Sequence, residues 1–262
     1  MNSQLPIGIF DSGVGGLSVW SQIAKLLPFE SIIYLADSAN CPYGSKSKEE
    51  IIRLSVKNTE LLLSKKCKII IVACNTATAA SIDYLRKNYK VPFVGMEPAV
   101  KPAALNSLTR NVGILATEGT FNGRLFKETS SKYAKYINFH IQIGNGLVEL
   151  VEAGNIDTPE ADILLRKYIQ PFIDANVDQI VLGCTHYPFL SDAIRKITND
   201  KMQIVEPSEA VARRTKDQLI INEILSLNDK TPNYQFYTTG NETVIKKMVS
   251  KLIGNSANIF KV

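Results

Sequence analysis

The sequence is poor in the residues that build metal sites and disulfides, with only four cysteines and two histidines in 262 residues. The cysteines are widely spaced, and no two of them form a CxxC pair: Cys41, Cys67, Cys74 and Cys184. Structural zinc sites use closely spaced Cys and His ligands, so we expect the protein to hold no metal.

Long hydrophobic runs are also missing. No apolar stretch approaches the ~18 residues that cross a membrane, and the first six residues lack the basic and apolar regions of a signal peptide. We therefore expect a cytoplasmic protein with no membrane partner. Disulfides are rare in the cytoplasm, so we expect none here. The net charge is only +5. Because no aromatic residues interleave with Lys65, Lys66 and Lys68, we interpret these lysines as solvated helix ends and expect no nucleic-acid partner.

What is present is a regular alternation of strand and helix patterns, which predicts an α/β protein with mainly parallel sheets. We expect strands at 7–10, 31–36, 69–73 and 91–95, separated by helices at 15–27, 48–64 and 76–88. Near the end of the chain we expect a helix at 216–225, a strand at 234–238 and a helix at 242–253.

The two halves of the chain share landmarks in the same order. Segment 7–12 aligns with 112–117, Cys74 with Cys184, and the Glu-Pro pair at 97–98 with the one at 206–207. The number of residues between the two members is nearly the same in each case. We therefore expect two similar doubly wound domains related by internal duplication. The first comprises residues 1–100 and 215–262, the second 101–214, with the active site in the cleft between them. The alternative is that doubly wound folds share these patterns without any duplication.

Each aligned cysteine follows a buried-strand pattern and is followed by polar residues, as expected for a strand that ends at a pocket. Cys74 opens a predicted helix, whose positive end should lower the pKa of the thiol, and Asn75 and Thr76 offer donors for a carboxylate. After Cys184, His186 could exchange a proton with the thiol or the substrate. A lone buried cysteine is usually inert; the matching positions of the two are what favours chemistry.

A glycine-rich turn, residues 11–17, connects the first strand and helix. It lacks the spacing of a phosphate loop. An acid, Asp11, placed before backbone amides at a helix start would attract an ammonium group beside an anion, and together these describe an amino acid. The alternative is a plain turn with Asp11 as the helix cap. Removing the α-proton of an amino acid makes a carbanion, which usually needs a cofactor. We find no convincing pyridoxal-binding lysine and expect no cofactor, so the protein must stabilise the charge itself.

Segments 11–17, 42–44, 72–77 and 183–188 together resemble the bacterial glutamate racemases, which belong to the cofactor-independent aspartate/glutamate racemase family. The resemblance implies that the protein interconverts L- and D-glutamate for peptidoglycan synthesis. It also suggests a homodimer. It implies that Cys74 and Cys184 are the two bases, with Asp11 assisting the first, and Glu152 and His186 the second. The positions implied to hold the substrate are Asp11, Ser12, Pro42, Tyr43, Gly44, Asn75, Thr76, Thr117, Thr120, Thr185 and His186.

The chain departs from the family in three places. Residues 37–41 read Asp-Ser-Ala-Asn-Cys, where the family usually has a threonine and a basic residue. Residues 145–146 read Asn-Gly in place of a common Cys-Pro pair. The N-terminal extension of activator-dependent members is absent, so we do not expect control by a peptidoglycan precursor.

Other functions stay open. A related racemase acting on aspartate or a hydantoin would share both cysteines. A Cys-His hydrolase would explain Cys184 and His186 and would accumulate an acyl-enzyme. A catalytically idle protein that contacts DNA-processing machinery is a third alternative. The second, matching cysteine argues against the last two.

Overall fold

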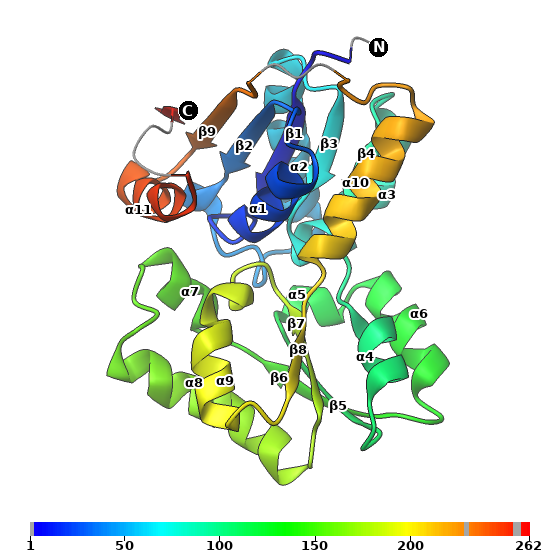
Figure 1. The fold of residues 1–262 in the computed structure, drawn as a ribbon, viewed down its shortest axis with the longest axis vertical. Helices are drawn as coiled ribbons and strands as arrows, with labels where there is room; N and C mark the ends of the chain where they lie inside the picture. Colours follow the sequence, from blue (N-terminus) through cyan, green and yellow to red (C-terminus); the bar gives the residue numbers. More distant parts are fainter. Residues whose placement is uncertain (1–2, 228–230, 254–257) are drawn as a thin grey trace.

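The computed structural model describes residues 3–227, 231–253 and 258–262, which form two α/β domains stacked end to end (Figure 1). Among these residues the first sheet has six strands, in the order β10-β9-β2-β1-β3-β4. Its strands are β1 (Ile7–Asp11), β2 (Ile32–Ala36), β3 (Ile69–Val72), β4 (Phe93–Gly95), β9 (Tyr234–Thr238) and β10 (Asn258–Lys261). The second sheet, in the order β6-β5-β7-β8, comprises β5 (Asn111–Ala116), β6 (Asn138–Ile143), β7 (Gln179–Gly183) and β8 (Gln203–Val205).

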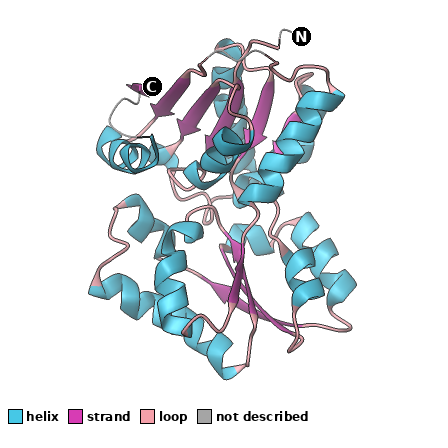
Figure 2. Cartoon of the chain, viewed as in Figure 1, coloured by secondary structure: helices cyan, strands magenta, loops and turns pink. Residues whose placement is uncertain are grey.

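Helices flank both sheets, and all the strand pairs are parallel (Figure 2). Around the first sheet lie α1 (Leu17–Leu26), α2 (Lys48–Ser64), α3 (Asn75–Asn88), α10 (Ser208–Ile221) and α11 (Glu242–Ile253). The second domain contains α4 (Val100–Asn106), α5 (Glu118–Phe121), α6 (Arg124–Tyr133), α7 (Leu147–Glu152), α8 (Pro159–Asp174) and α9 (Ser191–Thr198). Short 3-10 turns are η1 (Ser38–Asn40) and η2 (Tyr187–Leu190). Because helices cover both faces, a central strand such as β3 reads as a continuous apolar run, and all four of its residues are buried.

The two sheets share one topology. In each, the first strand in sequence pairs with the second on one side and the third on the other, and the fourth pairs with the third. Each first strand also has a glycine that a side chain of a neighbouring segment approaches closely. A Cβ on Gly8 would lie 2.9 Å from Cys67 Sγ, and one on Gly113 would lie 3.0 Å from the ring of Phe172. The matching strand order is what a duplication would produce.

The end of the chain returns to the first sheet, where β9 pairs with β2 and β10 pairs with β9. Helix α10 lies along α1 (Figure 1). The predicted bounds 216–225 for this helix are wrong: it starts at Ser208 and ends at Ile221, since Glu223 takes a left-handed φ of 56°. The predicted domain boundary at 214/215 falls inside α10 and stays a prediction. Strand β10 was not predicted.

The lysine-rich surroundings of Lys68 predicted a solvated helix end, and for Lys68 this prediction is wrong. Its ammonium is buried and lies 2.6 Å from Glu30 Oε2 and 2.6 Å from the carbonyl oxygen of Ser3. A buried ammonium needs such partners, because the interior solvates charge poorly. In the described part of the chain, no helix is long and apolar enough to cross a membrane.

Candidate active site

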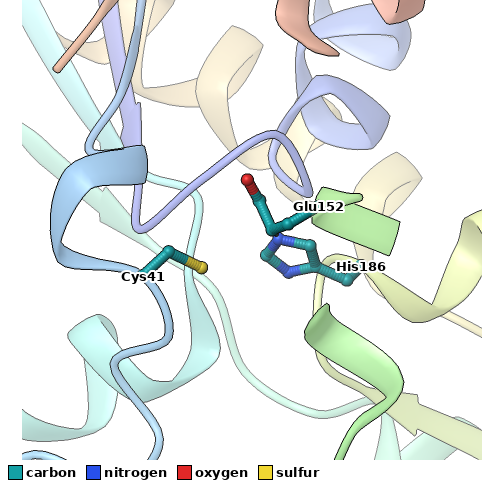
Figure 3. A group of neighbouring side chains, drawn as sticks. All are labelled: Cys41, Glu152 and His186. Carbon is teal, nitrogen blue, oxygen red and sulfur yellow. The ribbon is translucent and has the colours of Figure 1, made fainter. Parts of the chain in front are cut away.

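Segments from both domains meet where the two sheets face each other. Cys41 comes from the loop after β2, Glu152 ends α7, and His186 follows β7 (Figure 3). The three side chains place a sulfur, a carboxylate oxygen and a ring nitrogen within 4.8 Å of one another. These residues are far apart in the sequence, so neither the spacing of the cysteines nor the small number of histidines indicated that they come together.

A small pocket at this junction is lined by both aligned cysteines. Its lining is Ser12, Pro42, Tyr43, Gly44, Cys74, Asn75, Thr76, Thr117, Val148, Cys184, Thr185 and His186. Except for Val148, all of these residues are candidates named from the sequence. The remaining candidates, Asp11, Glu152 and Thr120, lie behind the lining and hydrogen-bond to it.

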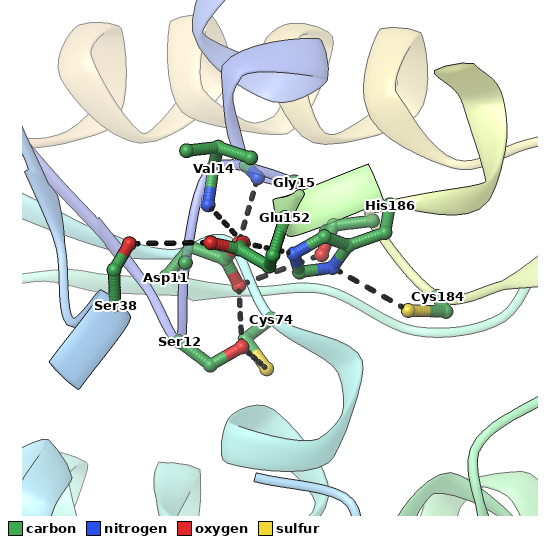
Figure 4. A network of polar contacts seen from close by, with 12 residues as sticks. Asp11, Ser12, Val14, Gly15, Ser38, Cys74, Glu152, Cys184 and His186 are labelled. Carbon is green, nitrogen blue, oxygen red and sulfur yellow. Dashed lines mark hydrogen bonds and ion pairs between the residues drawn. The ribbon is translucent and has the colours of Figure 1, made fainter. Parts of the chain in front are cut away.

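Cys74 heads a chain of polar contacts that ends at Asp11 (Figure 4). Its thiol lies 3.7 Å from Ser12 Oγ, and the Ser12 hydroxyl donates to Asp11 Oδ1 over 3.4 Å. The sulfur also caps α3 by accepting from the amide of Ala77 at 3.4 Å. Burial and the nearby Asp11 carboxylate raise the pKa of Cys74. The predicted lowering by the helix end is therefore wrong, because one capping amide does not outweigh desolvation and a negative neighbour. Cys74 is a neutral thiol at neutral pH.

Cys184 heads a second chain, which ends at Glu152 (Figure 4). Its sulfur lies 3.7 Å from His186 Nδ1, and the other ring nitrogen, Nε2, lies 2.6 Å from Glu152 Oε1. Burial works against charge on His186, yet the neighbouring thiols and Glu152 raise its pKa well above the ordinary value. Burial likewise opposes ionisation of Glu152, but the His186 contacts and the Val14 amide lower its pKa. The pair is thus an imidazolium and a carboxylate.

Glycines let the two domains approach this closely. A Cβ on Gly13 would overlap the carboxylate of Glu152, and one on Gly15 would lie 2.5 Å from His186 Nδ1. Across the pocket, a Cβ on Gly44 would lie 3.0 Å from that of Thr117. The glycine-rich turn therefore serves contact between the domains, which its own sequence could not reveal.

Direct hydrogen bonds also cross the junction. The amide of Val14 donates to Glu152 Oε1 at 2.7 Å, and the Thr185 hydroxyl donates to Asp11 Oδ1 at 3.4 Å. On the other side of the pocket, the hydroxyl oxygens of Thr76 and Thr117 are 2.8 Å apart. Glu152, Asp11 and Thr76 are thus each oriented partly by a residue of the other domain.

Asn75 is the conspicuous unsatisfied group of the pocket. Its side-chain nitrogen and oxygen are both buried, and neither has a hydrogen-bond partner among the residues that the structure describes. Buried amides are normally paired, because each lost hydrogen bond costs free energy. The Asn75 side chain thus offers the pocket a free donor and a free acceptor, which a polar ligand could bind.

Comparison with known proteins places the chain among racemases. The family model for Asp/Glu/hydantoin racemases matches residues 7–215. A glutamate racemase of Herpetosiphon aurantiacus is 42% identical over 243 residues, covering 93% of this chain and 96% of that protein. Among solved structures, a glutamate racemase isoform of Bacillus anthracis is 30% identical with a TM-score of 0.88, covering 100% of this chain and 98% of that one. A Francisella tularensis glutamate racemase in complex with D-glutamate is 28% identical, covers 99% and 98%, and has a TM-score of 0.83.

Proposed function

The chain belongs to the Asp/Glu/hydantoin racemase family and is an amino-acid racemase, and on this basis we propose that it interconverts L- and D-glutamate by two-base proton transfer at Cα. One observation carries the proposal: two thiols from equivalent positions of two domains line the same pocket. The choice of glutamate is supported by the relatives, which are glutamate racemases, and by D-glutamate in the Francisella tularensis structure.

In the proposed reaction the two sulfurs act on opposite faces of Cα. With L-glutamate, Cys184 as thiolate takes the α-proton, and the electron pair left on Cα spreads into the adjacent carboxylate. Cys74, held as a neutral thiol, then gives its proton to the other face, so a new C–H bond forms with inverted configuration. D-glutamate follows the same steps in reverse, with Cys74 as the base. Each sulfur ends a turnover in the protonation state that the other began with.

The groups behind the sulfurs return them to their starting states. His186 is within reach of Cys184 and can exchange a proton with it, while Glu152 holds the ring and balances its charge. In the same way, Asp11 can exchange a proton with Cys74 through the Ser12 hydroxyl. The free donor and acceptor of Asn75 are suited to a substrate carboxylate and ammonium. The carbanion is stabilised by such fixed donors, and no cofactor is required.

Two further parts of the proposal follow from the family resemblance: the D-glutamate is used in peptidoglycan synthesis, and the protein acts as a homodimer. Sedimentation velocity of the purified chain tests the second part, for which a single species of monomer mass is the contradicting result.

The direct test is circular dichroism of L-glutamate incubated with protein freed of metal and pyridoxal. The signal should decay to zero, and the Cys74→Ser/Cys184→Ser double variant should leave it unchanged. Decay with L-aspartate but not with L-glutamate would instead favour a related racemase with another substrate. Accumulation of an acyl-enzyme with amide or ester substrates would favour a Cys-His hydrolase.

A further inference from the structure

We propose that Cys41, Glu152 and His186 form a Zn²⁺ site that bridges the two domains and inhibits the enzyme when occupied. The three residues offer a thiolate, a carboxylate and an imidazole, which are the ligand types that zinc prefers. Their ligand atoms already lie within 4.8 Å of one another (Figure 3).

The geometry needs little adjustment. Around a tetrahedral zinc ion with bonds of about 2.0–2.3 Å, neighbouring ligand atoms are roughly 3.3–3.7 Å apart. Glu152 Oε1 and His186 Nε2 are closer than that, at 2.6 Å, because they share a hydrogen bond. A zinc ion would replace the shared proton, and Cys41 would close on it from the other domain.

The surroundings suit an ion that enters from solvent. The His186 side chain is 1% exposed and that of Glu152 18%, while Cys41 is half-buried. The inner ligand is therefore fixed and the outer two can be reached. Glu152 is also oriented by the Val14 amide at 2.7 Å, an outer contact of the kind that strengthens metal sites.

The charges balance on binding. The Cys41 S–H bond breaks and a sulfur–zinc bond forms, His186 becomes neutral, and both protons leave to solvent. One thiolate and one carboxylate then neutralise the two positive charges of the ion. Cys41 lies in the loop after β2, whereas Glu152 and His186 belong to the second domain.

Inhibition follows from the position of the ion, and this part rests on the proposed function. A His186 whose ring is bound to zinc cannot exchange a proton freely with Cys184, which lies 3.7 Å from Nδ1. Zinc would also tie the loop after β2 to α7 and hold the two domains together across the pocket. Binding itself is measured without substrate, so failure of the site and failure of the proposed function are distinguishable.

The test compares the full chain with Cys41→Ala and with Cys67→Ala, a control that removes a buried thiol packed against Gly8 and away from the pocket. Zinc chloride is titrated in the absence of substrate, and Co²⁺ is used as a spectroscopic probe of a metal–thiolate bond. We expect one tightly held zinc ion and a thiolate-to-cobalt absorption band in the wild type and in Cys67→Ala. In Cys41→Ala the band should vanish and the zinc affinity should fall at least about 100-fold, because loss of even an outer-shell contact costs 10- to 100-fold.

Racemase activity gives the second readout. Zinc should inhibit the wild type and Cys67→Ala, and EDTA should restore their rates, while the rate of Cys41→Ala should be the same with and without zinc. Should Cys41→Ala fold poorly, Cys41→Ser replaces it with the same expectation. Equal zinc affinity and equal inhibition with and without Cys41 would overturn the proposal, since the ion would then sit on the pocket cysteines. Absence of zinc binding by the wild type would also overturn it.

Discussion

His186 Nε2 lies 2.6 Å from Glu152 Oε1, which makes these residues a largely buried ion pair directly behind Cys184. Removing one partner of such a pair leaves an uncompensated charge. The charge of His186 therefore depends on the position of Glu152 at the end of α7. It also depends on the glycine-rich turn, whose Val14 amide donates to Glu152.

Glu152→Gln should lower kcat/KM about 100-fold, because His186 loses the negative partner that keeps it charged and oriented. The loss should be equal in both directions, since the enantiomers have the same free energy and their equilibrium ratio cannot change. Circular dichroism with each enantiomer measures it. Glu149→Gln, an exposed substitution on the same helix, should stay near wild type. A wild-type rate in Glu152→Gln would show that the ion pair has no part in the reaction.

Gly13→Ala should lower kcat/KM about tenfold or more, since the added Cβ would overlap the Glu152 carboxylate and push it off Val14 and His186. The same change in a Glu152→Ala background should cost less than about twofold, because neighbouring sites are not additive. Kinetics of the two single variants and the double variant test this coupling. Additive losses would mean that Gly13 matters for some reason other than Glu152.

Stability should depend on Cys67 at alkaline pH. Burial raises the pKa of this thiol to about 12, whereas in the unfolded chain it ionises near about 8.5. A raised pKa in the folded state means that the stabilisation is complete below the unfolded value and is lost as pH rises towards 12. By about pH 10 the unfolded state gains about 2 kcal/mol from this group.

Urea unfolding at about pH 8 and about pH 10 tests this for the wild type and Cys67→Ala. The free energy of unfolding should fall between the two pH values by about 2 kcal/mol less in the variant. The packing cost of the substitution is the same at both pH values and cancels. An identical decline in the two proteins would contradict the prediction.

Much of the pocket was predictable because parallel strands bring their carboxyl ends to one edge of a sheet. A polar residue at the end of a buried run, such as Asp11, Cys74 or Cys184, is therefore a pocket candidate from its position alone. The family resemblance supplied candidates that follow no strand, Glu152 among them. The match to the racemase family model confirms the resemblance itself, and the roles of these residues stay predictions.

What could not be predicted depends on how the two domains meet. The contact of Gly13 with Glu152 and the grouping of Cys41 with His186 join segments far apart in the chain. The direction of the pKa shift of Cys74 was missed for the same reason. Its helix position is visible in the sequence, but its burial and its nearness to Asp11 are tertiary properties. Helix α10 was misplaced because the second repeat was assumed to continue to residue 215.

The central claim, that the two cysteines act on opposite faces of Cα, is tested most directly by elimination from glutamate analogues that carry chloride at Cβ. Removal of the α-proton expels chloride and leaves an enamine, which hydrolyses to 2-oxoglutarate and ammonium, so only one base is needed. Cys74→Ser and Cys184→Ser should both nearly lose racemisation, because serine is a far weaker base than thiolate at neutral pH. Cys74→Ser should still eliminate from the L-analogue and Cys184→Ser from the D-analogue. Elimination from both enantiomers at equal rates by both variants would contradict the two-base account.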